Sequence, residues 1–256
     1  MLKSIINVAM DAGKIVLSGA DKNKHINYKG SIDMVTEFDL KAEALILDKM
    51  SKLFPNYNFV AEESSNDPFK EYDKAIYIDP IDGTTNFIHG FPFVSVSIGV
   101  YQNGEGVYGV VYNPITDELF YAEKGNGAFL NGKNIYVSKT PLLQQSLCAT
   151  GFPYIKDKLP ELMQILEKTL SSTRGIRRAG SAALDLCYTA KGVFDLYYET
   201  SLKPWDISAG MIILSEAGGK VTDIKGGNRP LNTGELIASN GLVHNEFINL
   251  ISDNNL

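Results

Sequence analysis

The sequence contains few of the residues that mark several common kinds of protein. Among its 256 residues are two cysteines, three histidines and one tryptophan. Cys148 and Cys187 are far apart and neither belongs to a Cys-x-x-Cys pair, which argues against a disulfide framework and a thiolate zinc site. We expect both to be buried free thiols in a protein of a reducing compartment, the cytoplasm.

A surplus of basic residues and long apolar runs are also missing. Lysine and arginine number 24 against 30 aspartate and glutamate residues, so the formal net charge is −6 and the pI is about 5.2. This balance argues against nucleic-acid binding through a general basic surface. No uncharged apolar run approaches the roughly 18 residues of a membrane-spanning helix, and the N-terminal segment lacks the apolar stretch of a signal peptide. The sequence therefore predicts neither a nucleic-acid partner nor a membrane association.

What the chain does contain is an ordinary globular composition, with 44% hydrophobic and 21% charged residues. Apolar spacing and turn residues indicate helices and strands along its whole length. The predicted helices span residues 2–19, 37–54, 159–170, 181–191, 206–217 and 243–251. The predicted strands span residues 58–61, 74–78, 94–101, 107–112, 118–123, 193–198 and 236–239. We expect an α+β fold of layered sheets and helices in two intimately packed sub-domains, residues 1–140 and 141–256.

One pattern among the predicted strands imitates a dinucleotide-binding loop. Residues 104–109, Gly-Glu-Gly-Val-Tyr-Gly, match the glycine spacing of that loop. A dinucleotide-binding loop needs a strand before it and a helix after it, whereas here a second strand follows. We therefore predict a hairpin turn at Gly104.

The most informative segment is residues 79–87, Asp-Pro-Ile-Asp-Gly-Thr-Thr-Asn-Phe. It follows the apolar strand predicted for residues 74–78, and its proline and glycine indicate that the strand ends there. Thr84, Thr85 and Asn86 can cap a short helix whose free N–H groups would bind an anion. Two carboxylates beside an anion site indicate a divalent cation between them. The alternative from these residues alone is an acidic turn that only caps the helix.

Acidic residues at other places in the chain have related contexts. Glu62 and Glu63 follow the strand predicted for residues 58–61. Asp206 opens a predicted helix, and Asp39 lies near the start of another. Carboxylates without a histidine or cysteine cluster favour a hard cation, above all Mg²⁺, with Mn²⁺ as a substitute. Taken singly, Asp206 could instead cap its helix and Glu62 could be a solvated charge.

Together, these segments resemble the motifs of the inositol monophosphatase family of metal-dependent, lithium-sensitive phosphatases. Residues 79–87 are similar to the first signature of that family, and residues 205–210, Trp-Asp-Ile-Ser-Ala-Gly, are similar to the second. Shorter segments that also match the family pattern are residues 35–39, 61–64, 180–183 and 197–199. The resemblance runs from about residue 5 to about residue 250. It implies the family's layered αβαβα sandwich and a homodimer.

The resemblance also implies roles for individual residues. The implied Mg²⁺ ligands are Glu62, Asp79, Ile81 (through its carbonyl oxygen), Asp82 and Asp206. Asp79 would bridge two ions, with a weaker third ion near Glu62. The implied catalytic residues are Thr84, Asp39 and Glu62, with Thr84 and Asp39 as a pair that helps to activate water. The implied substrate contacts are Asp82, Gly83, Thr84, Gly180, Ser181, Ala182, Glu199 and Asp206.

The function that the resemblance implies is that of a Mg²⁺-dependent phosphomonoesterase. Metal-bound water would directly attack myo-inositol monophosphate or a similar small polyol phosphate. Alternative substrates are fructose 1,6-bisphosphate, NADP⁺ and 3′-phosphoadenosine nucleotides, for which Arg177 or Arg178 could bind a second phosphate. A non-catalytic partner-binding protein with the same fold is a further alternative, although no residue of the implied site is missing.

The remaining candidates are expected to have structural roles. We expect His89 to pack or to cap its helix, and His25 and His244 to lie on the surface. Trp205 is expected to pack in the interior and so to position Asp206.

Overall fold

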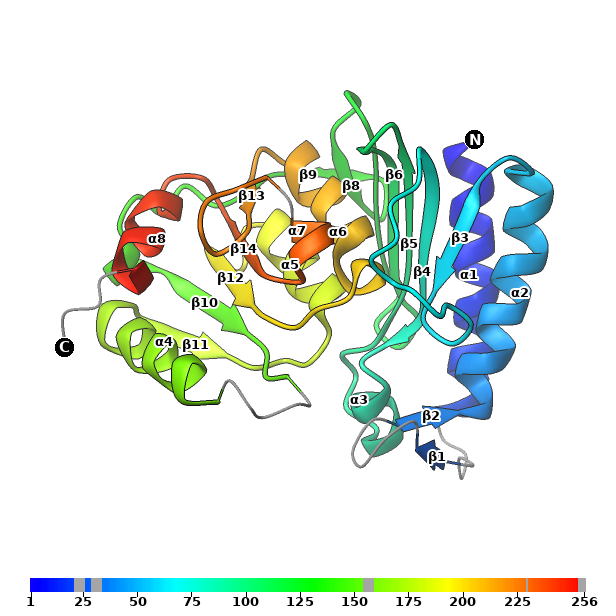
Figure 1. Cartoon of the computed structure of the whole chain (residues 1–256), viewed down its shortest axis with the longest axis horizontal. Helices are drawn as coiled ribbons and strands as arrows, with labels where there is room; N and C mark the ends of the chain where they lie inside the picture. Colours follow the sequence, from blue (N-terminus) through cyan, green and yellow to red (C-terminus); the bar gives the residue numbers. More distant parts are fainter. Residues whose placement is uncertain (21–25, 29–33, 154–158, 229, 253–256) are drawn as a thin grey trace.

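The computed structural model describes residues 1–20, 26–28, 34–153, 159–228 and 230–252. Figure 1 shows these residues arranged in five layers: helices, a sheet, helices, a second sheet and further helices. This arrangement confirms the expected αβαβα sandwich. His25 lies outside the described residues, so its predicted place on the surface stays a prediction.

The larger sheet has seven strands in the order β3-β4-β5-β6-β7-β8-β9. They are β3 (Asn58–Ala61), β4 (Lys74–Asp82), β5 (Ser95–Gln102), β6 (Glu105–Asn113), β7 (Glu118–Glu123), β8 (Ala128–Leu130) and β9 (Lys133–Ile135). β3 and β4 are parallel, and all the other neighbours are antiparallel. β8 and β9 are additional to the strands predicted from the sequence. Gly104, with a φ of +76°, lies in the hairpin turn between β5 and β6, so the nucleotide-loop pattern is indeed a turn.

The smaller sheet has five strands in the order β11-β10-β12-β14-β13. They are β10 (Leu147–Thr150), β11 (Gly175–Arg177), β12 (Leu196–Glu199), β13 (Lys220–Thr222) and β14 (Leu236–Ser239). A separate two-stranded ladder joins β1 (Ile26–Tyr28) and β2 (Met34–Thr36). The division into sub-domains 1–140 and 141–256 stays a prediction.

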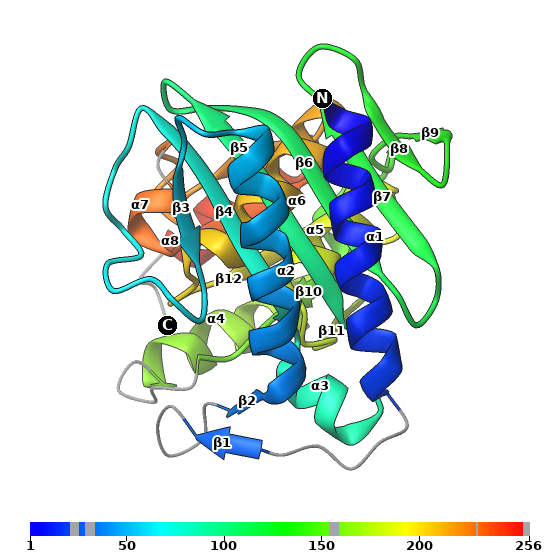
Figure 2. The same cartoon turned by 90° about the vertical axis from the view of Figure 1, so that its right-hand side faces the viewer.

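The helices form the other three layers. α1 (Leu2–Gly19) and α2 (Glu37–Leu53) cover the outer face of the larger sheet, as Figure 2 shows. α5 (Ala182–Ala190) and α6 (Pro204–Glu216) lie between the sheets, and α4 (Leu159–Ser172) and α8 (His244–Ser252) cover the smaller sheet. The short elements are α3 (Thr84–His89), α7 (Pro230–Thr233) and a 3₁₀ turn, Leu143–Gln145. No helix in the described part of the chain is both long and apolar enough to cross a membrane.

Close packing of α6 on the larger sheet accounts for two glycines in neighbouring strands. A Cβ atom at Gly99 would lie 2.5 Å from Ser208 Oγ, and one at Gly109 would lie 2.5 Å from the carbonyl oxygen of Ala209. Any larger residue would therefore push the helix away from the sheet. These contacts set the distance of α6 from β5 and β6, and β5 pairs directly with β4, the strand that carries the acidic motif.

The end of β4 differs from the sequence prediction. The strand was expected to stop at residue 78, but it continues to Asp82. Its pairing with β5 has a register shift between Asp79 and Asp82. An irregularity of this kind accommodates Pro80, which has no N–H group to donate to the ladder. The strand therefore carries both aspartates of the motif within its last residues.

The start of α6 also differs. The helix begins at Pro204, so Asp206 is its third residue and does not open it. Proline is favoured at the first helical position because that residue needs no N–H donor there. The strand predicted at residues 193–198 is β12, which begins three residues later, at Leu196.

Candidate active site

Four acidic side chains from separate parts of the chain line one cavity of about 380 Å³. Glu62 follows β3, and Asp79 and Asp82 lie at the end of β4. Because β3 and β4 run parallel, their carboxyl ends meet at the same edge of the sheet. Asp206 reaches the cavity from the first turn of α6, in the layer between the sheets.

Burial makes Asp79, Asp82 and Asp206 hard to ionise, and for Asp79 and Asp206 repulsion between the acids adds to the effect. Burial, followed by the charges on the three other acids, raises the pKa of Asp79 well above its ordinary value. Burial and then the charge on Asp82 raise the pKa of Asp206 in the same direction. Burial raises the pKa of Asp82 to about 6, although a hydrogen bond from Ser181 opposes the rise. A cation among these groups would reverse the shifts and favour the carboxylates.

The donor set fits a hard divalent cation such as Mg²⁺. The lining offers carboxylate oxygens and the backbone of Ile81. Within the described residues, no group of three or more histidine, cysteine, aspartate or glutamate side chains is placed so that those side chains alone could hold a metal ion. Mg²⁺ commonly uses one or two carboxylates, keeps several waters and takes further oxygens from phosphates. The cavity therefore suits ions whose coordination is completed by water and substrate.

Helix α5 holds one oxygen of Asp82. Asp82 Oδ2 accepts hydrogen bonds from Ser181 Oγ at 2.6 Å and from the backbone N–H of Ala183 at 2.7 Å. Ser181 is also the N-cap of α5, where its hydroxyl accepts from the N–H of Leu184. The acid on β4 is therefore oriented by a helix that is about 100 residues away in the chain.

Backbone donors orient two other acids. Asp79 Oδ1 accepts from the N–H of Ile81 at 3.0 Å, within the same motif. Asp206 Oδ2 accepts from the N–H of Lys203 at 2.7 Å. Asp206 therefore does cap its helix, as the alternative from the sequence suggested. This hydrogen bond does not prevent Asp206 from binding a cation in the cavity, because a carboxylate has several acceptor positions.

A buried acid that the sequence analysis missed supports the turn that carries Glu62. Glu43, on α2, is 4% exposed, and its Oε2 accepts from the N–H of Glu63 at 2.8 Å. Ser65 Oγ accepts from the N–H of Ala61 at 2.8 Å. These two bonds hold both ends of the turn after β3. The only feature of the sequence that could have indicated the burial of Glu43 is its position beside the apolar face of the predicted helix.

Thr84 and Asp39 are in contact, as the resemblance implies. Thr84 Oγ1 lies 3.1 Å from Asp39 Oδ1 and 3.0 Å from the carbonyl oxygen of Ile81. The other oxygen of Asp39 accepts from the N–H of Thr36 at 2.8 Å and from its hydroxyl at 2.5 Å, which closes a capping box at the start of α2. Burial raises the pKa of Asp39, although the hydrogen bonds from Thr36 and Thr84 oppose the rise.

Helix α3 begins differently from the prediction. Gly83 is its N-cap, not Thr84, Thr85 or Asn86, and Thr84 is the first helical residue. The Thr84 hydroxyl is already hydrogen-bonded elsewhere, so it does not cap the helix. Gly83 has a φ of +96°, and a Cβ there would lie 3.0 Å from the carbonyl oxygen of Phe93. Only glycine fits this position without strain.

The cavity is also lined by the residues predicted to contact substrate hydroxyls: Gly180, Ser181, Ala182 and Glu199. Glu199 ends β12, and its Oε2 accepts from the hydroxyl of Tyr197 at 2.6 Å. Burial raises the pKa of Glu199 to about 7, although this hydrogen bond opposes the rise. Near neutral pH the group can therefore accept from a polyol hydroxyl or donate to it.

A glycine and a phenylalanine that the sequence analysis missed also line the cavity. A Cβ at Gly151 would collide with the carboxylate of Glu199, so the absence of a side chain there makes room for that acid. Phe152 lies next to it and is 39% exposed. The Gly-Phe-Pro sequence at residues 151–153, directly after β10, was the signal that could have indicated a turn at the site.

The two neighbouring arginines have different positions. Arg178 lines the cavity, with its guanidinium carbon 5.9 Å from the ring centroid of Phe152. Arg177 is exposed, is not part of the cavity lining, and donates to the carbonyl oxygen of Ile176 at 3.1 Å. Of the pair, Arg178 is therefore the one placed to meet a ligand.

The prediction for His244 was wrong, because the residue is completely buried. Its Nδ1 lies 2.9 Å from Ser239 Oγ and its Nε2 lies 2.9 Å from Thr222 Oγ1, so both ring nitrogens have partners. Burial lowers the pKa of His244 to about 4. It begins α8 and faces the smaller sheet, which sequence spacing alone did not indicate. His89, the last residue of α3, is exposed and therefore does not pack.

The expected burial of Trp205, Cys148 and Cys187 is confirmed, while the positioning of Asp206 by Trp205 stays a prediction. Trp205 is 7% exposed, and it belongs to the apolar cluster between the sheets. Cys148 and Cys187 are both buried free thiols.

A layered αβαβα sandwich with this acid-lined cavity defines the class of the protein, a phosphatase and hence a hydrolase. The chain belongs to the inositol monophosphatase family, whose model matches residues 1–255. It is 43% identical over 255 residues to inositol monophosphatase 2 of Solanum lycopersicum, across 97% of this chain and 96% of the relative.

Two further comparisons cover most of the chain. A protein of Thermotoga maritima named fructose-1,6-bisphosphatase/inositol-1-monophosphatase is 42% identical over 224 residues, 88% of this chain and 84% of that protein. The crystal structure of the extragenic suppressor protein suhB from Bartonella henselae matches with a TM-score of 0.93 and 38% identity. That match covers 99% of this chain and 98% of the other.

Proposed function

We propose that the protein is a Mg²⁺-dependent phosphomonoesterase that hydrolyses myo-inositol monophosphate or a similar small polyol phosphate. The observation that carries this proposal is the shared cavity: four acids suited to cations lie beside a partly buried carboxyl group, Glu199, suited to polyol hydroxyls. Mg²⁺ neutralises the acids and the phosphate together, which explains how an acidic cavity can bind an anion.

The proposed ligands of one Mg²⁺ are Glu62, Asp79 and the carbonyl oxygen of Ile81. Those of a second are Asp79, Asp82 and Asp206, with a weaker third ion near Glu62. When bound, Mg²⁺ supplies positive charge to the phosphate and leaving oxygens and makes a nearby water a better nucleophile. Mn²⁺ is expected to substitute for Mg²⁺, and Li⁺ is expected to inhibit.

Thr84 and Asp39 are the proposed proton acceptors for the attacking water. The water would donate to Thr84 Oγ1, while the Thr84 hydroxyl donates its own proton to Asp39 Oδ1, 3.1 Å away. The new oxygen–phosphorus bond forms as the bond from phosphorus to the polyol oxygen breaks. The leaving alkoxide takes up a proton from a solvent water, and Asp39 returns the proton it gained to solvent. No covalent phosphoenzyme is needed.

The rest of the lining binds and orients the substrate in this proposal. The backbone N–H groups of Gly83 and Thr84 would donate to phosphate oxygens. Ser181 and Glu199 would bind hydroxyl groups of the polyol, with Gly180 and Ala182 shaping the wall beside them. Glu199 can accept two hydroxyl hydrogen bonds, which suits neighbouring hydroxyls on a ring.

A bisphosphate is the second candidate substrate, and the position of Arg178 favours it. Arg178 lines the cavity beside an exposed aromatic ring, where a planar guanidinium could bind a second phosphate. One relative is named as acting on fructose 1,6-bisphosphate as well as inositol phosphate. NADP⁺ and 3′-phosphoadenosine nucleotides belong to the same alternative. Arg177 does not support it, because it is not part of the lining.

Three further parts of the proposal concern the oligomeric state, the compartment and the partner-binding alternative. We propose a homodimer, as the resemblance implies. We also propose a reducing compartment such as the cytoplasm, because both cysteines are free and buried. A purely partner-binding role is disfavoured, because the cavity lining, together with Asp39 in contact with Thr84, keeps every residue that the proposed chemistry uses.

The test is phosphate release by chelator-stripped protein with and without added Mg²⁺. The substrates are inositol 1-phosphate, fructose 1,6-bisphosphate, NADP⁺ and 3′-phosphoadenosine 5′-phosphate. Mg²⁺-dependent release supports the proposal, and the order of kcat/KM values identifies the preferred substrate. Folded protein that releases phosphate from none of these substrates, or equally well without a metal, would overturn it.

A further inference from the structure

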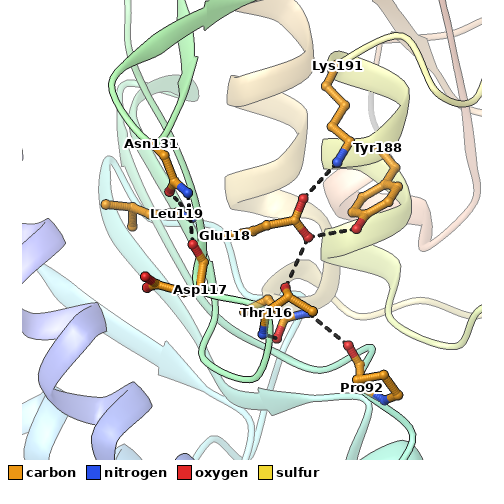
Figure 3. Close-up of polar contacts among 9 residues, drawn as sticks. Pro92, Thr116, Asp117, Glu118, Leu119, Asn131, Tyr188 and Lys191 are labelled. Atoms are coloured by element: carbon orange, nitrogen blue, oxygen red, sulfur yellow. Dashed lines mark hydrogen bonds and ion pairs between the residues drawn. The ribbon is translucent and has the colours of Figure 1, made fainter.

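A cluster of polar side chains ties the C-terminal end of α5 to the larger sheet (Figure 3). Glu118, the first residue of β7, accepts from Lys191 Nζ at 2.7 Å and from the hydroxyl of Tyr188 at 2.7 Å. Thr116 Oγ1 donates to the same carboxylate at 3.1 Å. The side chains of Glu118 and Lys191 are each only 18% exposed. We call Glu118, Tyr188 and Lys191 the α5 clamp.

Aromatic packing holds the clamp in place. Lys191 Nζ lies 3.8 Å from the ring centroid of Tyr188, close enough for a cation–π contact. The Tyr188 ring packs against three phenylalanines: Phe93 at 5.3 Å, Phe194 at 5.9 Å and Phe120 at 6.1 Å between centroids. Phe93 and Phe120 belong to the larger-sheet half of the molecule, and Phe194 precedes β12. The tyrosine is therefore fixed from both sides of the sandwich.

The charge on Glu118 is also stabilised there. Burial acts to raise its pKa, but the hydrogen bonds from Lys191 and Tyr188 leave the pKa of Glu118 below its ordinary value. The carboxylate therefore stays ionised and keeps both donors at neutral pH. A partly buried pair of this kind is less screened by salt than an exposed one.

The opposite end of α5 contacts the proposed metal site. Ser181 Oγ and the N–H of Ala183 both donate to Asp82 Oδ2. α5 has nine residues, which corresponds to about 14 Å at 1.5 Å per residue. Its middle is fixed as well, because a Cβ at Gly210 of α6 would lie 2.6 Å from Leu186 Cβ. A helix of this length that packs closely at its middle can tilt about that contact, so a displacement of its C-terminal end also displaces its N-terminal end.

We propose that the α5 clamp positions the N-terminal end of α5, so that Ser181 and Ala183 hold Asp82 in the orientation that binds metal. Glu118, Tyr188 and Lys191 are therefore positioning residues that touch neither substrate nor metal. The proposal rests on the proposed function in one respect, namely that Asp82 is a ligand of the metal ion. Its structural part, that the clamp orders the first turn of α5, stands independently.

The main variant is Lys191→Met, which removes the charge and keeps most of the side-chain length. Loss of a group that orients a metal ligand typically weakens metal binding by about 10- to 100-fold. Because this clamp acts through a helix, we expect about a three- to tenfold rise in the Mn²⁺ dissociation constant, measured by electron paramagnetic resonance. The Mg²⁺ concentration for half-maximal activity should rise by a similar factor, with KM for substrate within about twofold. Glu118→Gln should act in the same direction.

Two controls separate positioning from general stability. Lys124→Met breaks the pair between Lys124 and Glu105, 2.6 Å apart on the same sheet but away from α5, and should leave Mn²⁺ binding unchanged. Val243→Ala removes buried apolar volume in the cluster beneath α8 and lowers stability without touching α5. Lys191→Arg keeps the charge and should bind Mn²⁺ as the wild type does, in contrast to Lys191→Met.

Amide hydrogen exchange at Ala183 tests the structural part without any metal. We expect faster exchange at this N–H in Lys191→Met than in the wild type, Lys124→Met or Val243→Ala. The proposal is overturned if the Ala183 N–H exchanges at the wild-type rate in Lys191→Met. It is also overturned if Lys191→Met binds Mn²⁺ no more weakly than Val243→Ala when the two variants lose the same amount of Tm. If the wild type itself binds no Mn²⁺, the proposed function fails, and the exchange result still decides whether the clamp orders α5.

Discussion

The hydroxyl of Ser181 donates to Asp82 Oδ2 at 2.6 Å, although 99 positions separate the two residues in the chain. One belongs to the helical layer between the sheets and the other to the end of β4. The bond joins the two halves of the sandwich at the cavity that we propose for catalysis. The orientation of this acid therefore depends on how the layers pack, not on the motif alone.

Replacing Asp82 or Asp206 with asparagine should abolish most turnover. Asparagine keeps the size of the side chain but removes one negative charge from the proposed second metal site. We expect kcat/KM to fall by at least about 100-fold, together with weaker Mn²⁺ binding. The control is Asp73→Asn, an exposed acid just before β4, which should retain wild-type kinetics. Near-normal activity of either site variant would show that the ligand assignment is wrong.

Removing the hydroxyl of Thr84 should slow the chemical step and leave metal binding intact. Thr84→Val keeps the shape of the side chain but cannot accept a proton from water or donate to Asp39. Asp39→Asn should have a similar effect, because its amide is a poor proton acceptor. Loss of general base catalysis typically costs about 10²- to 10⁴-fold in rate.

Single-turnover kinetics at saturating Mg²⁺ would measure this step directly. Thr84→Ser retains the hydroxyl and should keep most of the activity. If Thr84→Val were within about threefold of the wild type while binding Mn²⁺ normally, the pair would have only a structural role.

The specificity prediction concerns Arg178. If the guanidinium binds a second phosphate, Arg178→Met should lower kcat/KM for fructose 1,6-bisphosphate by about 10- to 100-fold, the effect of one hydrogen bond to a charged group. The value for inositol 1-phosphate should change far less. Arg177→Met is the matched control, because Arg177 is exposed and outside the cavity lining. An equal loss on both substrates would remove Arg178 as a determinant of specificity.

Acid sensitivity is predicted from His244. Its pKa is about 4 in the folded protein and near the ordinary 6.5 in the unfolded chain. Between these values the unfolded chain binds the proton and the folded protein does not, so protonation favours unfolding. His244 therefore makes the free energy of unfolding fall as the pH drops from about 6.5 to about 4, by about 3 kcal/mol in total.

Urea unfolding of the wild type and His244→Gln in EDTA across this pH range measures the effect. Other buried acids have raised pKa values and act in the opposite direction, so the informative quantity is the difference between the two proteins at each pH. The variant should be less stable at pH 7, and the gap should narrow toward pH 4. Parallel pH profiles would contradict the assignment.

The residues of the candidate site were largely predictable because they cluster in short motifs. Residues 79–87 place two acids, a glycine and two threonines within nine positions, and local chain geometry keeps such neighbours together. The resemblance of the second signature added Asp206. The structure brings both segments to one cavity, as expected, while the roles in metal binding and catalysis stay predictions.

Other features could not be read from the sequence because they depend on contacts between distant segments. Glu43 supports the turn beside Glu62 from another layer, and its place beside the apolar face of a predicted helix does not show which turn it would meet. His244 was expected on the surface, but packing of α8 against the smaller sheet buries it. Gly83, not Thr84, is the N-cap of α3, and the hydroxyl of Thr84 contacts Asp39 and the carbonyl oxygen of Ile81.

The sequence by itself determined the helices and strands of a layered fold through apolar periodicity, and the family and the acids around the cavity through the resemblance of its short motifs to a known family. Tertiary structure alone decided how those acids are held. The bonds from α5 to Asp82, the place of Arg178 beside Phe152, and the clamp at Lys191 all join segments that are far apart in the chain. Such contacts arise only when the layers pack, since no local pattern specifies which distant partner a side chain will meet.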